Sequence, residues 1–227
     1  MSAELLSPPV LDFLWESQGG GELPYPLEVA SHGATMDERS RLRNETFAIL
    51  RDSGLLDREG GLDRRLAGWF ALLARAERSI DSVFVPGDGE PMRAMVALAS
   101  GDRALLAEQR PDGVLVQDLH PSSLASTVVD ALPPGTRGTE RSFTVLAADE
   151  PTVPLLSEPR LRGGQFGVNH RDAVDGRRRA RVLAWFDLRS GRYLMYRKPG
   201  PDGREWLTVA PSDALALRQR LTELLTR

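Results

Sequence analysis

Two stretches of this sequence follow one plan and lie ninety positions apart. Each contains a Ser-Gly, a Pro-Asp-Gly and a Pro-Ser landmark, at 100–101, 111–113 and 121–122 in the first copy and at 190–191, 201–203 and 211–212 in the second. The offset is 90 at all three landmarks (191 − 101, 202 − 112 and 212 − 122). Gly and Pro favour turns, and a Ser before an apolar run caps a helix. Each copy therefore predicts strand, turn, strand, turn, strand and helix, with Ser122 and Ser212 as the helix caps.

Outside the repeat, apolar residues recur at helical spacing in three further segments. Helices are expected over 7–18, 36–53 and 62–76, in addition to those of the repeat over 122–132 and 212–226. Thr35 and Glu38 form a capping box at the second helix, and Asp63 caps the third. Residues 23–29 contain two prolines and are expected as an edge strand, because proline cannot donate a ladder hydrogen bond.

The apolar runs between the turns predict an antiparallel sheet. The expected strands are 80–85, 92–98, 103–109, 114–119, 143–147, 165–171, 181–188, 192–198 and 205–209. The fold class is α+β, with a central antiparallel β-sheet from two quasi-symmetric β-meander-plus-helix halves, flanked by helices. We expect a single domain over 1–227, made of an N-terminal half (1–132), a proline-rich connector (133–162) and a C-terminal half (163–227).

The composition argues against several classes of protein. The chain has 227 residues, a net charge of −3 and no cysteine. Disulfides and thiolate metal sites are therefore excluded, and no strong field attracts nucleic acid or an anionic membrane. No apolar run approaches the roughly 20 residues that cross a bilayer, and the first residues lack the order of a signal peptide. We expect a cytoplasmic protein that neither binds nucleic acid nor inserts into a membrane.

The strands of the second copy do not alternate between apolar and polar residues. In 182–186 and 193–196 both faces carry apolar or aromatic side chains, whereas an antiparallel strand with one wet face should alternate. Helices that cover both faces would explain the pattern, and this interpretation is favoured. The alternative is that one face near the local twofold axis stays open and receives an apolar partner.

Catalytic and metal-binding patterns are lacking. The glycine-rich segment 163–167 leads into a strand rather than a helix, so it offers no helix N-terminus to a phosphate. None of the histidines has metal-ligand spacing, and all three are expected in loops or at the surface: His32, His120 and His170. We therefore expect no enzyme activity, no cofactor and no metal. Arginines 177–179 and Arg181 form the densest charge run, expected as a solvated hairpin tip, with a contact to an acidic partner as the alternative.

Several motifs together resemble the EspG family, cytosolic chaperones of actinobacterial type VII secretion. In the N-terminal half these are Leu-Pro-Tyr-Pro-Leu (23–27), the Thr35-capped helix, and Gly-Leu-Leu-Asp (54–57) before a helix with Trp69. In the C-terminal half they are Gly-Gly-Gln-Phe-Gly (163–167), Trp-Phe-Asp (185–187), Ser-Gly-Arg-Tyr (190–193), the Asp-Gly…Trp strand (202–206) and Ala-Pro-Ser (210–212). The resemblance spans nearly the whole chain. It implies two quasi-symmetric halves around a central sheet, in agreement with the repeat.

The resemblance also implies a function. It indicates a chaperone that binds the apolar helical tip of a secreted PE–PPE-like heterodimer, or of a WXG100-like one, and keeps it soluble for export. The family uses the central sheet and the C-terminal helical region for this contact. The candidate partner-binding residues are large side chains on those strands, although only one face of each strand can be right: Phe166, Trp185, Tyr193, Met195 and Tyr196. The connector is shorter than the helical material of mycobacterial members, which implies a different groove wall.

A second hypothesis belongs to another class of protein. A small-molecule-sensing regulatory domain would use a ligand cleft between the two halves, and it would respond to metabolites without a protein client. The sequence is also compatible with a weak homo-oligomer.

Overall fold

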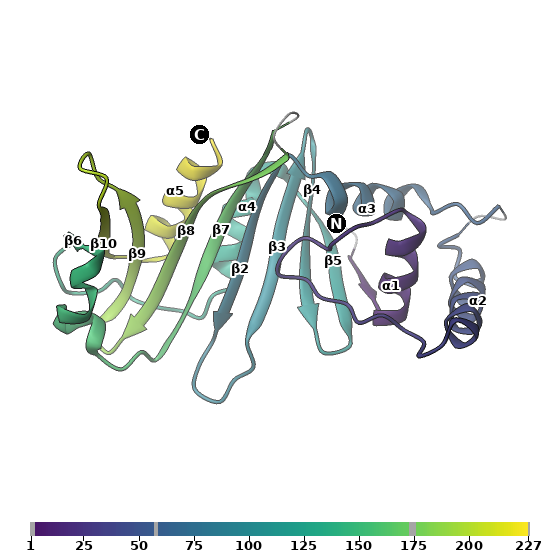
Figure 1. Cartoon of the computed structure of the whole chain (residues 1–227), viewed down its shortest axis with the longest axis horizontal. Helices are drawn as coiled ribbons and strands as arrows, with labels where there is room; N and C mark the ends of the chain where they lie inside the picture. The colour runs from purple at the N-terminus through teal and green to yellow at the C-terminus, as the bar shows by residue number, and fades with distance from the viewer. Residues whose placement is uncertain (1–2, 57–58, 173–175, 227) are drawn as a thin grey trace.

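The described residues form one ten-stranded sheet in which all neighbouring strands are antiparallel (Figure 1). The structure is a computed structural model that describes residues 3–56, 59–172 and 176–226, without the side chains of 172–181. Across the sheet the strands are β1 (Ala3–Leu6), β5 (Gly113–Leu119), β4 (Arg103–Arg110), β3 (Arg93–Ser100), β2 (Arg78–Val85), β7 (Arg162–Asp172), β8 (Gly176–Leu188), β9 (Gly191–Pro199), β10 (Glu205–Pro211) and β6 (Phe143–Leu146). The predicted α+β class with a central antiparallel sheet is confirmed.

The two copies of the repeat meet where β2 pairs with β7. The pairing runs from Arg78 opposite His170 to Val85 opposite Gly163. From this junction the strands follow outward in chain order, as β2–β3–β4–β5 on one side and β7–β8–β9–β10 on the other. Each half then ends in a helix, α4 (Leu124–Asp130) or α5 (Ala214–Leu225), and the two helices begin 90 residues apart (214 − 124). The sheet is therefore pseudo-twofold symmetric about the β2–β7 junction.

One face of the sheet, here called the helix-covered face, packs against α4 and α5. These two helices contact each other and lie behind β2, β7 and β8 in Figure 1. Burial of apolar side chains is the main term that stabilises such a layer. The central residues of this core are Ile80, Phe84, Met95, Phe166, Val168, Leu183 and Trp185 from the strands and Leu124, Val128, Leu217 and Leu221 from the helices.

The opposite face, here called the open face, is covered at its two ends. The helices α1 (Pro8–Ser17) and α3 (Arg64–Arg75) pack over β3, β4 and β5 at the N-terminal end. The 3₁₀ helices η2 (Ala147–Thr152) and η3 (Pro154–Ser157), with β6, lie at the C-terminal end. Between them, only parts of β2, β7, β8 and β9 reach solvent on this face, since Ser79, Asp81 and Asn169 are buried there. Both interpretations of the non-alternating strands are thus partly right: over 182–186 and 193–196 one face is covered by α4 and α5, and the other has a gap.

One sheet edge differs from the sequence prediction. Residues 23–29 form no strand but a turn, in which the Tyr25–Pro26 peptide bond is cis. The two prolines remove backbone donors that a strand would need. The edge position is taken by β1, which pairs with β5 from Ala3 opposite Gln117 to Leu6 opposite Val114. The strand predicted over 143–147 is found as β6, which pairs with β10 at the other edge.

The predicted serine caps are each displaced by one or more residues. In the first half a short 3₁₀ helix, η1 (Pro121–Ser123), precedes α4, and the His120 ring accepts the Ser122 backbone N–H at its start. In the second half Asp213, not Ser212, caps α5 and accepts the Ala216 N–H at 2.8 Å. Aspartate is as good a cap as serine, so the local pattern could not choose between neighbours. The Thr35 cap of α2 (Met36–Asp52) and the Asp63 cap of α3 are as predicted.

Asp12 on α1 is the main polar link between α1 and α2. Its carboxylate accepts hydrogen bonds from both Nη atoms of Arg39, at 3.0 and 3.1 Å, and from the His32 backbone N–H at 2.7 Å. Burial by itself raises the pKa of Asp12, but the hydrogen bonds from Arg39 and His32 outweigh it, so the pKa lies below its ordinary value. The Arg39 guanidinium also lies 4.8 Å from the centroid of the Phe13 ring. The α2 helix is thus attached to the body by a partly buried ionic contact.

The Asp12 contact predicts a pH-dependent stability. Asp12→Asn should lower the free energy of unfolding by about 1.5–3 kcal/mol near neutral pH, because Arg39 loses a charged acceptor. Since the folded pKa is lowered, this stability is fully present above the unfolded value of 3.8 and is lost as the pH falls through the folded pKa. Urea unfolding from neutral pH down to about pH 3 should show the difference between wild type and variant narrowing in acid. If the difference in unfolding free energy between wild type and variant stayed constant over this pH range, Asp12 would not have the lowered pKa.

Candidate functional site

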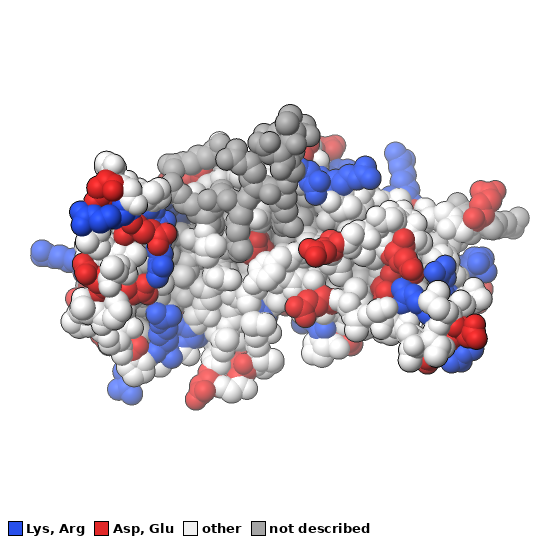
Figure 2. Space-filling view, in the orientation of Figure 1, with Lys and Arg blue, Asp and Glu red and all other residues white. Residues whose placement is uncertain are grey.

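The uncovered part of the open face is a row of uncharged residues across four strands. Val83 on β2 lies opposite Gln165 on β7, Gln165 opposite Ala184 on β8, and Ala184 opposite Met195 on β9. All four are partly exposed, and the neighbouring Val182 is 39% exposed. Figure 2 shows this region as uncharged surface between the charged ends of the molecule. This set, Val83, Gln165, Val182, Ala184 and Met195, is here called the open row.

The open row ends in a depression where the sheet splits. Strands β8 and β9 pair from Ala184 opposite Met195 to Leu188 opposite Gly191, and beyond Ala184 they separate (Figure 1). The depression has a volume of about 370 Å³ and is lined by Val182, Ala184, Met195, Tyr196, Arg197, Glu205 and Leu207. A concave, mostly apolar surface with charges at its rim is typical of a partner-binding site.

Three of the five predicted partner-binding residues lie inside the protein. Phe166 and Trp185 are 0% and 1% exposed and pack against α4 and α5 on the helix-covered face. Tyr193 lies on the open face but is buried, because its ring stacks on Phe186 at 5.7 Å between centroids in the core under η3. All three hold the strands of the open row in place from within.

The other two predicted residues lie on opposite faces of β9. Met195 is in the open row and is partly exposed. Tyr196 packs against α5 on the helix-covered face, where the Arg220 guanidinium lies 5.0 Å from its ring centroid. The structure therefore brings Met195 together with Val182 and Ala184, which the sequence analysis did not select. Their signal was weak, because small aliphatic residues in a strand are usually core residues.

A buried ionic group fixes the turn beside the open row. Asp187 on β8 accepts hydrogen bonds from Arg192 Nε at 2.7 Å and from Arg162 Nε at 2.6 Å. Arg192 also donates to the Pro133 carbonyl at 2.7 Å, and its guanidinium lies 4.6 Å from the Trp185 ring centroid. Asp187 and Arg192 are both almost fully buried. This group ties the β8–β9 hairpin to the start of the connector.

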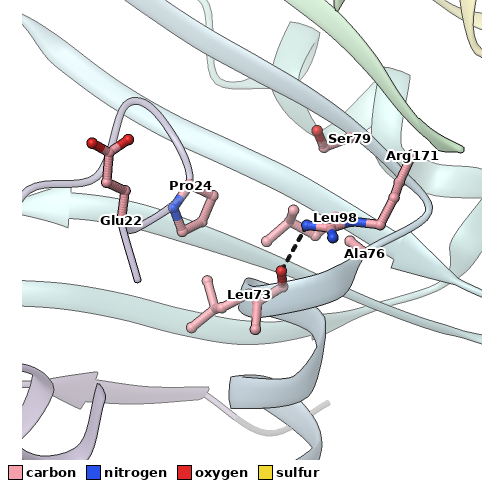
Figure 3. Close-up of a pocket in the computed structure, with 8 residues that line it drawn as sticks. Glu22, Pro24, Leu73, Ala76, Ser79, Leu98 and Arg171 are labelled. Atoms are coloured by element: carbon pink, nitrogen blue, oxygen red, sulfur yellow. Dashed lines mark hydrogen bonds between the residues drawn. The ribbon is translucent and has the colours of Figure 1, made fainter. Parts of the chain in front are cut away.

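The junction of the two halves contains a small cavity (Figure 3). Its volume is about 70 Å³, and Leu73, Ser79 and Leu98 are among its lining residues. At its rim, Arg171 Nη2 donates to the Ala74 carbonyl at 2.9 Å, the dashed bond in Figure 3, and so satisfies one of the last carbonyl groups of α3. Sites for small molecules are typically several hundred Å³ in volume. This cavity is smaller than such a site and does not supply the metabolite cleft of the second hypothesis, which stays a prediction.

The histidines have structural partners. His32 Nδ1 lies 3.2 Å from Asp12, His120 Nδ1 lies 2.7 Å from the Ser122 hydroxyl, and His170 Nε2 lies 2.9 Å from the Leu224 carbonyl. Within the described ranges, no three His, Asp or Glu side chains gather as metal ligands. In the same part of the chain, no helix is both long and apolar enough to cross a bilayer. The side chains of arginines 177–179 and Arg181 lie outside the described residues, so the two interpretations of that run stay predictions.

The family of the chain follows from a match over almost its whole length. The EspG family model matches residues 7–223. The chain belongs to the EspG family. The match includes both copies of the repeat and the connector between them. The family resemblance inferred from scattered motifs is thereby confirmed.

Individual EspG proteins give two further comparisons. ESX-3 secretion-associated protein EspG3 of Mycolicibacterium smegmatis is 32% identical over 82 residues, which cover 36% of this chain and 28% of that protein. The solved structure of the Mycobacterium tuberculosis type VII secretion system chaperone EspG5, in complex with the PE25–PPE41 dimer, aligns with a TM-score of 0.72. At 12% identity, the alignment covers 99% of this chain and 96% of that one. The chain therefore has the EspG5 fold.

The buried ionic group predicts a large loss of stability when one partner is removed. Asp187→Asn should lower the free energy of unfolding by about 3–5 kcal/mol, because Arg192 would stay buried without a counter-charge. The double variant Asp187→Leu with Arg192→Met should recover most of this loss, since it removes both charges. Urea denaturation followed by tryptophan fluorescence would measure both effects. If both variants lost the same free energy of unfolding, the packing of these side chains, and not their charge pairing, would stabilise this part of the protein.

Proposed function

We propose that this protein is a cytosolic, non-enzymatic chaperone of type VII secretion. Its client would be a secreted helical heterodimer of the PE–PPE-like or WXG100-like kind, bound through the apolar tip of its helices and kept soluble until export. The observation that carries this proposal is the EspG family match over residues 7–223. The EspG5 likeness supports it, since that chaperone was solved with a PE25–PPE41 dimer and has the same fold over 99% of this chain.

The open row supports the proposal physically. Val182, Ala184 and Met195 together form an apolar patch on the open face, and such patches mark sites of protein interaction. An apolar helical tip aggregates when it is free. Packing it on the open row would remove apolar surface of both the client and this protein from water, which stabilises the complex. Of the five residues selected from the sequence, we assign direct client contact to Met195. For Phe166, Trp185, Tyr193 and Tyr196 client contact stays a prediction, because in the free protein their rings pack inside the chain.

Co-purification with candidate clients tests this function. The protein should form a stable complex with at least one PE–PPE-like or WXG100-like heterodimer encoded in the same genome. Met195→Glu should weaken this complex by about tenfold or more, because it places a charge in an apolar contact. Affinity would be measured by isothermal titration or biolayer interferometry with purified components.

The matched control is Ile49→Glu. Ile49 is the more exposed of the two, at 63%, but it lies on α2, away from the open row and from the C-terminal helix. It should leave the affinity for the client unchanged. Failure of every such heterodimer to bind the wild-type protein would reject the proposed function.

A further inference from the structure

The depression at the end of the open row has a covered counterpart in the first half of the chain. The β3–β4 turn is closed by Ser100 opposite Arg103, and the β8–β9 turn by Leu188 opposite Gly191. Equivalent residues in these strands are therefore 88 apart (188 − 100 and 191 − 103). The offset between structurally equivalent residues in these strands is therefore 88, two fewer than the offset of 90 between the sequence landmarks.

This spacing pairs the open row with named residues of the first half. Val96 lies opposite Ala107, and their equivalents Ala184 (96 + 88) and Met195 (107 + 88) also lie opposite each other. By the same offset Val182 corresponds to Ala94. On the outer strands, Val116 lies opposite Ala107, as Val209 lies opposite Met195. The two sites therefore have the same backbone arrangement, related by the pseudo-twofold axis.

In the first half, α3 covers this site. The helix contacts β3 and β4, and its apolar side chains Leu66, Trp69, Phe70 and Leu73 form one core with Val96 and Ala107. Both strand residues are 0% exposed. The large residues of α3 follow the i, i+3, i+4, i+7 pattern of an amphipathic helix. A sheet of this geometry is thus stable with one amphipathic helix across it.

In the second half, no described helix takes the equivalent place. The short helix η3 and strand β6 cover Tyr193, Leu207 and Val209, farther along the sheet, and leave Val182, Ala184 and Met195 partly exposed. The floor formed by these three residues carries no charge. At the rim, the Arg197 guanidinium is held by Glu150 at 2.5 Å and Glu205 at 3.5 Å, so it is already neutralised. Among the residues whose side chains the structure describes, the floor and rim therefore suit an apolar helix face with polar flanks.

We infer that a helix of the client occupies the twofold equivalent of α3. This inference rests on the proposed function and adds how the client is bound. The client helix lies across β8 and β9 as α3 lies across β3 and β4, and it presents large apolar residues at the spacing of Leu66, Trp69, Phe70 and Leu73. Since Ala184 and Val182 are small, the client helix approaches the sheet closely at this point.

A pair of matched valines tests the position of the client. Val182 and Val85 both lie in strands of the open face and are 39% and 42% exposed, but Val85 is at the far end of β2, outside the α3-equivalent site. With a heterodimer that binds the wild type, Val182→Asp should weaken binding by about tenfold or more, whereas Val85→Asp should change it less than about twofold. Thermal unfolding of both variants shows whether each is folded. Equal effects of the two substitutions would overturn the inference.

Site-specific cross-linking provides a second readout. The chain has no cysteine, so Val182→Cys, Met195→Cys and Val85→Cys each create one attachment point for a photo-cross-linker. The first two should cross-link to residues of one client helix with apolar i, i+3, i+4, i+7 spacing, and Val85→Cys should not. Cross-links from Val85→Cys alone would overturn the inference while leaving the proposed function intact. If no heterodimer is captured by the unlabelled wild type, the proposed function itself fails.

Discussion

The antiparallel pairing of β2 with β7 is the interaction on which the rest of this structure depends. It joins two β-meanders into one sheet and places α4 beside α5, so that a single core forms beneath both helices. The pairing is reinforced by side chains, since Asn169 donates to Asp81 at 2.8 Å and to Ser79 at 3.3 Å within the buried part of the junction. Without it, each half would expose a long strand edge, which is a template for aggregation.

The two halves share a backbone plan but differ in what covers the open face. In the first half the helices α1 and α3, encoded before the strands they cover, bury Val96, Leu98 and Leu105. In the second half the preceding segment is the connector, which contributes short 3₁₀ turns and one four-residue strand. Such a segment cannot span the same area as a twelve-residue helix. The gap on the open face lies where the connector supplies no α-helix equivalent to α3.

Buried charges hold the start of the connector, and apolar packing of η3 and β6 holds its later part. Arg192 and Arg162 satisfy Asp187, and Arg192 also bonds the Pro133 carbonyl, so that the chain leaving α4 runs past the β8–β9 turn toward the far edge of the sheet. A buried ion group adds little net stability compared with apolar residues of the same size, but it requires one geometry. Here that geometry brings η2, η3 and β6 to the side of the open row.

The sequence by itself determined what is local. The turn landmarks, the Thr35 and Asp63 caps and the apolar spacing specified the helices, most strands and the duplication, because backbone preferences and side-chain periodicity act over a few residues. It also showed that both faces of 182–186 and 193–196 are apolar. Only the tertiary structure decided that Tyr196 packs under α5 while Met195 faces outward, and that Val182 and Ala184 lie beside it. The apolar pattern of a strand indicates only that a face is buried. The element that buries it comes from a distant part of the chain or from another protein. The sequence of the strand does not distinguish these two cases.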